Sequence, residues 1–214
     1  MEDRGRAWVP AQKKSLHATE RDTEENRRRR EGFVERLRTI APERLIYLDE
    51  SGVSTQMTRR YARAPGGQRV GESTPEGNWK MLTILGAMSL DGMLATMTIE
   101  AATDGEIFLT DLDQVLCPKL KPGDVVVMDN LSSHKVTGVA ERIAKAGAEV
   151  LYLPPYSPDL NPIEKAWAKL KQQLRATKAR TAQALDQAIT DLLPTIRPQD
   201  ATAWFRLPFH PLHQ

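Results

Sequence analysis

Apolar residues recur along the chain with two different periods. In the first half, short apolar runs at "RLIYLDESG" (44–52), "WKMLTILGAMSL" (79–90) and "GMLATMTIE" (92–100) have the length and composition of strands. The second and third runs meet at Asp91-Gly92, a dipeptide typical of a tight hairpin turn. The pattern predicts a three-stranded antiparallel meander.

The second half of the chain alternates apolar strands with amphipathic helices. The predicted elements are, in order, a helix over 103–120, a strand over 123–130, a helix over 132–147, a strand over 148–155, and helices over 162–176 and 182–193. Strands separated by helices are expected to lie parallel, with right-handed crossovers. The predicted fold class is therefore α/β, a mixed sheet of three antiparallel strands followed by two parallel strands, with helices on both faces.

Two segments fall outside this alternation. Residues 19–40 carry Phe33, Leu37 and Ile40 at helical spacing and predict one helix that docks on the sheet. Residues 53–79, rich in Gly, Arg and Thr, are too long for an ordinary connection and predict a functional insertion. The predicted organisation is an arm and docking helix over 1–43, a main domain over 44–180 that contains the insertion, and a C-terminal helix and tail over 181–214.

Composition narrows the class of protein. The 214 residues suffice for one core of ordinary size, and 40% hydrophobic with 27% charged residues is typical of a globular protein. No apolar run is long enough to span a bilayer, and the N-terminus lacks the apolar region of a secretory signal. The single Cys117 cannot form an internal disulfide. These features predict a cytoplasmic protein that does not contact a membrane.

Three acids are expected at one end of the sheet. Asp49 is placed at the end of the first strand, Asp129 at the end of the first strand after the hairpin, and Glu164 at the start of the helix after the last strand. Open α/β sheets place their sites at this edge. Clustered carboxylates need a cation to stay ionised, and hard oxygen ligands suit Mg²⁺ or Mn²⁺. Two such ions can hold a phosphodiester and stabilise its leaving oxygen, so the pattern indicates nuclease or strand-transfer chemistry.

Each acid also has a purely structural interpretation. Asp49 could cap a loop, and Asp129 with Asn130 is a common strand-to-loop pair. Glu164 would complete a capping box in which Asn161 is the N-cap and Pro162 is the first helical residue. The sequence alone leaves both interpretations open.

Basic residues suggest where an anionic partner would lie, although the net charge is only +2. Residues 161–180 contain six Lys or Arg and one acid, Glu164, and Lys171 and Arg175 follow that acid along one flank of the predicted helix. The run "RRRR" at 27–30 lies among several Glu and is interpreted as a solvated helix face.

Other candidates accompany the three acids. In the insertion, Arg59, Arg60 and Arg63 are candidates for phosphate contacts. His134 lacks a second His at metal-ligand spacing, so we interpret it as a residue near the site rather than a ligand. The candidates for supporting the site are Asn130, His134 and Asn161.

Three phrases carry a resemblance to a known family. In their order and spacing, "YLDESG", "VVMDNLSSHK" and "LPPYSPDLNPIEKAWAKLK" resemble the DDE transposase domain of the mariner superfamily, and especially bacterial insertion-sequence family 630. Thirty-four residues separate Asp129 from Glu164, a spacing found in that group. The resemblance covers 8–205.

The resemblance implies an RNase H-like fold in which Asp49, Asp129 and Glu164 bind two Mg²⁺ or Mn²⁺ ions. Such enzymes cut transposon ends with water and then use the freed 3′-hydroxyl to attack target DNA, without a covalent protein intermediate. The implied partners are transposon-end and target DNA, and a second protomer or a full-length transposase, with the insertion 53–79 as a clamp between protomers. The implied location is the bacterial nucleoid in the cytoplasm.

Two alternatives to an active transposase remain at this stage. Relatives usually begin with helix-turn-helix modules, and the stretch before residue 41 is too short to hold them. The chain would then be the second reading frame of a split element, partnered by an upstream helix-turn-helix product, or a silent remnant that folds or dimerises. A haloacid-dehalogenase-like phosphatase is a remote alternative, because that chemistry needs an acid two positions after Asp49, where Ser51 stands.

Overall fold

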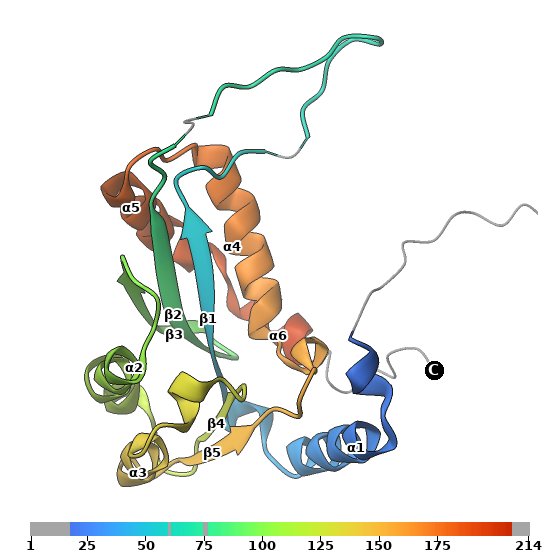
Figure 1. Cartoon of the computed structure of the whole chain (residues 1–214). Coiled ribbons are helices and arrows are strands. Elements are labelled where there is room, and N and C mark those ends of the chain that lie inside the picture. The colour runs from blue at the N-terminus through green and yellow to red at the C-terminus, as the bar shows by residue number, and fades with distance from the viewer. Residues whose placement is uncertain (1–17, 60, 75–76, 207–214) are drawn as a thin grey trace, which may run out of the picture.

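A five-stranded mixed sheet forms the centre of the structure, a computed structural model that describes residues 18–59, 61–74 and 77–206. The strand order across the sheet is β3-β2-β1-β4-β5 (Figure 1). The strands are β1 (Leu45–Ser54), β2 (Met81–Ser89), β3 (Gly92–Ile99), β4 (Val125–Met128) and β5 (Glu149–Tyr152). Strands β1, β2 and β3 pair antiparallel, whereas β4 lies parallel to both β1 and β5. The predicted sheet is confirmed, including the hairpin, where Gly92 has the positive φ of 106° that the turn requires.

Helices cover both faces of the sheet (Figure 1). They are α1 (Glu24–Arg38), α2 (Gly105–Asp111), α3 (Val139–Lys145), α4 (Ile163–Thr177), α5 (Ala182–Leu192) and α6 (Pro198–Phe205). One hydrophobic cluster joins α1, α4, α5 and α6 to one face, and a second joins α2 and α3 to the other. Each face of the sheet therefore has its own apolar layer, as the α/β pattern predicts.

The alternation of side chains along β1 connects the two layers. Leu45, Tyr47 and Val53 belong to the cluster on the α4 face. Ile46 and Leu48 belong to the cluster on the α2 and α3 face. Successive residues of a strand point to opposite faces, so Asp49 faces α4 and its neighbour Glu50 faces α2 and α3.

Several predicted boundaries were wrong. Strand β1 does not end at Asp49 but continues to Ser54, because β2 keeps pairing with it as far as Met81. The helix predicted over 103–120 is α2 followed by a π-helical turn at Leu112–Leu116 and a 3₁₀ turn at Cys117–Lys119. These boundaries depend on pairing and packing partners, which sequence periodicity does not report.

Two further helix predictions differ from the structure. The helix predicted over 132–147 is a 3₁₀ turn at Ser132–Lys135 and then α3, because Gly138 has a φ of 99° that no right-handed helix accommodates. Helix α6 was not predicted. It contributes Ala201 and Phe205 to the core, and the Phe205 ring meets the Tyr47 ring edge-on at 5.0 Å between centroids.

Within the ranges the structure describes, no helix combines the length and apolar character needed to cross a membrane. Between β1 and β2 the chain leaves the sheet as a long irregular segment that projects from the body (Figure 1). This segment corresponds to the insertion expected over 53–79, of which residues 53 and 54 still belong to β1.

Gly86 provides a test of the packing that surrounds Asp49. It pairs with Asp49 across β1 and β2, and a Cβ at this position would overlap the Trp167 ring and lie 2.9 Å from the Met93 methyl group. Gly86→Ala is expected to lower the free energy of unfolding by about 1 to 3 kcal/mol in urea titrations, because the site is already full. Gly32→Ala on α1 is the control, since no atom lies within 4 Å of its Cβ.

The control substitution should leave stability unchanged or raise it by up to about 1 kcal/mol, the difference in helix propensity. Equal effects of the two substitutions would contradict the packing described for Gly86.

Candidate active site

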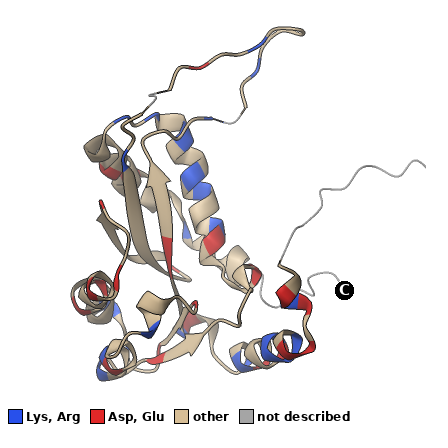
Figure 2. Ribbon diagram, viewed as in Figure 1, with Lys and Arg blue, Asp and Glu red and all other residues tan. Residues whose placement is uncertain are grey.

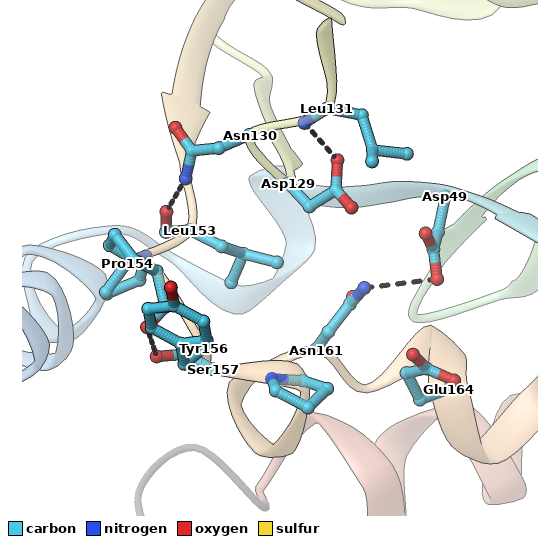
Figure 3. A pocket seen from close by; sticks show the side chains of 12 residues that line it. Asp49, Asp129, Asn130, Leu131, Leu153, Pro154, Tyr156, Ser157, Asn161 and Glu164 are labelled. Atoms are coloured by element: carbon cyan, nitrogen blue, oxygen red, sulfur yellow. Dashed lines mark hydrogen bonds between the residues drawn. The ribbon is translucent and has the colours of Figure 1, made fainter. Parts of the chain in front are cut away.

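Three carboxylates from separate elements line one cavity (Figure 3). Asp49 comes from the middle of β1, Asp129 directly follows β4, and Glu164 lies in the first turn of α4. Tyr47 pairs with Val127 in the parallel β1/β4 ladder, so Asp49 and Asp129, each two residues further on, are level with each other. The cavity has a volume of about 280 Å³.

The Asp49 carboxylate is fixed by two donors from the α4 side of the site. Its Oδ2 accepts hydrogen bonds from Trp167 Nε1 at 3.2 Å and from Asn161 Nδ2 at 3.3 Å. The residue is only 7% exposed. Burial, and then the negative charge of Glu164, raise the pKa of Asp49 to about 7.

Glu164 does not take part in the predicted capping box. The residue at the helix start is Pro162, with no side-chain cap, because the Asn161 amide is directed to Asp49 instead (Figure 3). Partial burial raises the pKa of Glu164, Lys171 opposes this, and the charge of Asp129 adds to the rise. The capping interpretation of Glu164 was therefore wrong, and its carboxylate lines the cavity.

Asp129 is held from behind by a buried histidine. His134 is completely buried, with Nδ1 2.7 Å from Asp129 Oδ1 and Nε2 3.3 Å from Glu50 Oε1. Neither nitrogen has hydrogen-bond geometry, so the attraction is that of an ion pair. The centroid of the His134 ring lies 4.4 Å from the centroid of the Phe108 ring on α2. Asp129 Oδ1 also accepts the backbone N–H of Leu131 at 3.0 Å.

The charges of this group stabilise one another. Burial favours neutral His134, but the carboxylates of Asp129 and Glu50 outweigh it and raise the pKa of the imidazole to about 9. Burial opposes ionisation of Asp129, but His134 and the Leu131 N–H outweigh it and lower the pKa of the carboxyl. An imidazolium therefore lies between two carboxylates near neutral pH. His134 contacts Asp129 and Glu50 and does not line the cavity.

Sequence reasoning missed Glu50 and Asp111. Glu50 points to the α2 and α3 face and reaches the site only through His134. Asp111, at the end of α2, is 2% exposed, and burial with the nearby charge of Glu50 raises its pKa to about 6. A signal for Glu50 was available in the sequence. Glu50 follows Asp49 within an apolar strand run, so its side chain points to the other face of the sheet, which must also be buried.

The loop after β5 forms the far wall of the cavity. Asn130 Nδ2 donates to the Leu153 carbonyl and ties this loop to the end of β4 (Figure 3). Ser157 Oγ donates to the Pro155 carbonyl at 2.9 Å. Tyr156 takes a φ of 55°, rare for a residue with a side chain, and its ring is half exposed in the cavity wall.

The candidate DNA contacts lie in two places. Lys171 and Arg175 are half-buried on α4, a helix that carries several basic residues along its length (Figure 2). Lys171 is close enough to Glu164 for its positive charge to lower the pKa of the Glu164 carboxyl. Arg59 and Arg63 are exposed on the projecting segment and do not line the cavity, and Arg60 lies outside the described residues.

The donor set fits a hard divalent cation. It consists of carboxylate oxygens and of Asn161 Oδ1, a buried atom without a hydrogen-bond partner in the described chain. The raised pKa of Asp49 is the effect that a cation would remove. Among the residues described, no three His, Cys, Asp or Glu side chains stand close enough to enclose one ion. Binding therefore requires the carboxylates to draw together.

Comparison with known proteins gives this site a context. A family model described as DDE superfamily endonuclease matches residues 44–186. No curated protein sequence gives a match.

Three solved structures have similar folds. The Mos1 transposase paired-end complex with left transposon end is 16% identical, has a TM-score of 0.77, and is matched over 96% of this chain and 65% of that chain. The mariner Mos1 paired end complex with Mg is 16% identical, with a TM-score of 0.70 and the same coverage. The catalytic domain of Mos1 mariner transposase is 17% identical, with a TM-score of 0.67 and 94% and 93% coverage.

These likenesses confirm the predicted RNase H-like mixed sheet. The chain spans 65% of the length of the first of these structures and almost the whole of the third.

Asp49 makes stability depend on pH. Its pKa is about 7 in the folded protein and 3.8 ordinarily, so the folded state binds the proton more tightly. The stabilisation that protonated Asp49 gives the folded state is fully present below about pH 4 and is lost as the pH rises through 7. The test compares the free energies of unfolding of Asp49→Asn and wild type in EDTA. Because wild type loses this stabilisation with rising pH and the amide does not titrate, the value for Asp49→Asn minus that for wild type is expected to rise by about 2 to 4 kcal/mol between pH 4 and pH 8.

Asp191→Asn, on the exposed side of α5, is the matched control and should show no such rise. A difference for Asp49→Asn that stays constant across this pH range would contradict the electrostatics described for the site.

Proposed function

Since the match over residues 44–186 shows that this chain belongs to the DDE superfamily endonucleases, we propose that it cleaves and joins DNA strands in transposition with the help of divalent cations. The observation that carries the proposal is the meeting of Asp49, Asp129 and Glu164 at one cavity, from three elements distant in sequence. Carboxylates in this arrangement are suited to a phosphodiester and its counter-ions.

We assign Mg²⁺ or Mn²⁺, as two ions, to the oxygens of Asp49, Asp129 and Glu164. When bound, such ions activate the attacking oxygen and stabilise the leaving one. The similar structures include paired-end complexes of Mos1 with Mg and with Mn, which supports this choice of metal.

The residues of the chain have separate roles in this proposal. Trp167 and Asn161 hold the Asp49 carboxylate on the α4 side, and His134 holds that of Asp129 from the opposite side. Because each of these two ligands is held by a buried partner, only a limited movement is needed when the three carboxylates draw together around the cations, which lowers the cost of organising the site.

The reaction has two displacements at phosphorus. Cleavage forms a bond between a water oxygen and phosphorus and breaks the bond to the 3′-oxygen, which leaves a 3′-hydroxyl and a 5′-phosphate. In strand transfer that 3′-hydroxyl gives up its proton and its oxygen bonds to a phosphorus of the target DNA, while the bond from this phosphorus to the target 3′-oxygen breaks and leaves a new 3′-hydroxyl on the target. No side chain becomes covalently attached to DNA in either step.

DNA and protein partners follow from the same proposal. Lys171 and Arg175 would contact the phosphates that pass Glu164, and Arg59, Arg60 and Arg63 would contact DNA from the insertion. The insertion 53–79 would act as a clamp to a second protomer or to a full-length transposase. Terminal-repeat recognition would come from a helix-turn-helix product of an upstream reading frame, and the protein would act at the bacterial nucleoid.

The alternatives have less support. A silent remnant has no need to keep three acids at one cavity with buried partners for two of them. The phosphatase alternative lacks its second acid, because Ser51 is buried inside β1. Membership of the endonuclease family also disfavours it.

Cleavage is expected to depend on Asp129. In a nicking assay with Mg²⁺ or Mn²⁺ on DNA carrying the element's ends, Asp129→Ala should lower the rate by about 100-fold or more, because a ligand of the reacting centre is removed. Asp191→Ala should retain the wild-type rate. Full activity of Asp129→Ala would refute the assignment of the site.

DNA affinity is expected to depend on the basic row of α4. Replacing Lys171 and Arg175 by Ala should weaken binding equally for all sequences and reduce the slope of log K against log salt concentration by about 1 for each phosphate that is no longer neutralised. Lys145→Ala, exposed on α3 across the sheet, is the matched control. An unchanged slope in the double variant would mean that DNA phosphates do not contact Lys171 and Arg175.

A further inference from the structure

The turn that leads into α4 is held by two arginines from the N-terminal segment. Arg30 on α1 makes two hydrogen bonds to Asp159, Nη1 to Oδ1 at 3.0 Å and Nη2 to Oδ2 at 2.7 Å. Arg21, in a 3₁₀ turn at Thr19–Asp22, adds a third hydrogen bond to Oδ2 at 3.3 Å. The side chains of Arg30 and Asp159 are only 15% and 24% exposed.

These interactions differ from the ion pairs that Arg28 and Arg29 make within the same helix. Arg28 and Arg29 bind Glu24 and Glu25 one turn away, with more than half of each side chain exposed. Such pairs contribute little to stability, whereas a sheltered bidentate arginine fixes both the position and the orientation of a carboxylate. The interpretation of "RRRR" as a solvated face therefore holds for Arg28 and Arg29 and is wrong for Arg30.

The backbone between Asp159 and Glu164 transmits this restraint. Asp159 lies in a 3₁₀ turn at Pro158–Leu160, in which the Asn161 N–H donates to the Pro158 carbonyl at 3.1 Å. The Glu164 N–H then donates to the Asn161 carbonyl at 3.2 Å. Leu160 and Asn161 are both buried. The turn is thus a short hydrogen-bonded unit that has Asp159 near one end and Glu164 at the other.

Two groups of the site depend on the placement of this unit. Asn161 donates to the Asp49 carboxylate, and Glu164 contributes its own carboxylate to the cavity. A turn released from Arg30 would move both, and would separate Glu164 from the two aspartates that β1 and β4 fix independently.

We propose that Arg30, with Arg21, is a positioning residue of the active site, and that α1 acts as a brace for the turn 157–162. The brace lies outside the matched range 44–186, so the alignment of Glu164 depends on a segment that the family match does not include. The proposal rests on the proposed function for its catalytic consequence, but its structural consequence is measurable without DNA.

The primary test compares Arg30→Ala with Arg28→Ala, its matched control on the same helix. Both variants remove one arginine ion pair, but only the first removes the bidentate contact to Asp159 and leaves that carboxylate with the single hydrogen bond from Arg21. We expect Arg30→Ala to raise the Mn²⁺ concentration for half-maximal nicking by about 10-fold, the lower end of the range for residues that orient a metal ligand. Arg28→Ala should match wild type.

Two measurements without DNA separate the brace from the proposed function. Mn²⁺ binding followed by electron paramagnetic resonance should weaken in Arg30→Ala by the same factor. Hydrogen exchange at the amides of Asn161 and Glu164 should accelerate in Arg30→Ala and not in Arg28→Ala. If wild type binds Mn²⁺ but does not nick DNA, the proposed function fails while these two measurements still decide the brace.

A charge exchange guards against a variant that merely unfolds. In an Arg21→Ala background, which removes the other cation at Asp159, Arg30→Asp and Asp159→Arg should each weaken Mn²⁺ binding, and the combination of the two should recover most of it because the ion pair is re-formed in reverse. Arg30→Lys, which keeps the charge but not the bidentate geometry, should fall between wild type and Arg30→Ala. Equal Mn²⁺ affinity and exchange rates in Arg30→Ala and Arg28→Ala, or no recovery in the combination, would overturn the proposal.

Discussion

The burial of three carboxylates beside one another is the constraint on which the rest of this structure depends. Asp49, Asp129 and Glu164 line one cavity, and without a counter-ion burial, followed by the charges of neighbouring carboxylates, disfavours ionisation of Asp49 and Glu164. The protein offsets this only in part, by giving each of the two aspartates a separate support. Trp167 and Asn161 donate to Asp49, and His134 pairs with Asp129.

The supports come from opposite faces of the sheet. Asp49 points from β1 toward α4, whereas Glu50 points toward α2 and α3 and reaches His134. One strand therefore contributes to the site from both faces, directly through Asp49 and indirectly through Glu50. Both hydrophobic layers must be formed before the site can be, so its geometry is a property of the whole core rather than of a loop.

The sequence predicts what depends on local pattern. The strands, the hairpin and the positions of Asp129 and Glu164 follow from apolar periodicity and element ends, and all are confirmed as structure. The bidentate interaction of Arg30 with Asp159 spans 129 residues and leaves no periodic signal. Asn161 was predicted as a cap because capping depends on local sequence, yet its amide serves a residue 112 positions away. Interactions of this kind require the tertiary fold.

We propose that these features together serve the binding of divalent cations by the three carboxylates. Anomalous diffraction from crystals soaked in Mn²⁺ tests this most directly. Two Mn²⁺ peaks are expected in the cavity, bonded at about 2.1 Å to oxygens of Asp49, Asp129 and Glu164. A cavity without Mn²⁺ in crystals that bind the ion elsewhere, or Mn²⁺ held there by other side chains, would contradict it.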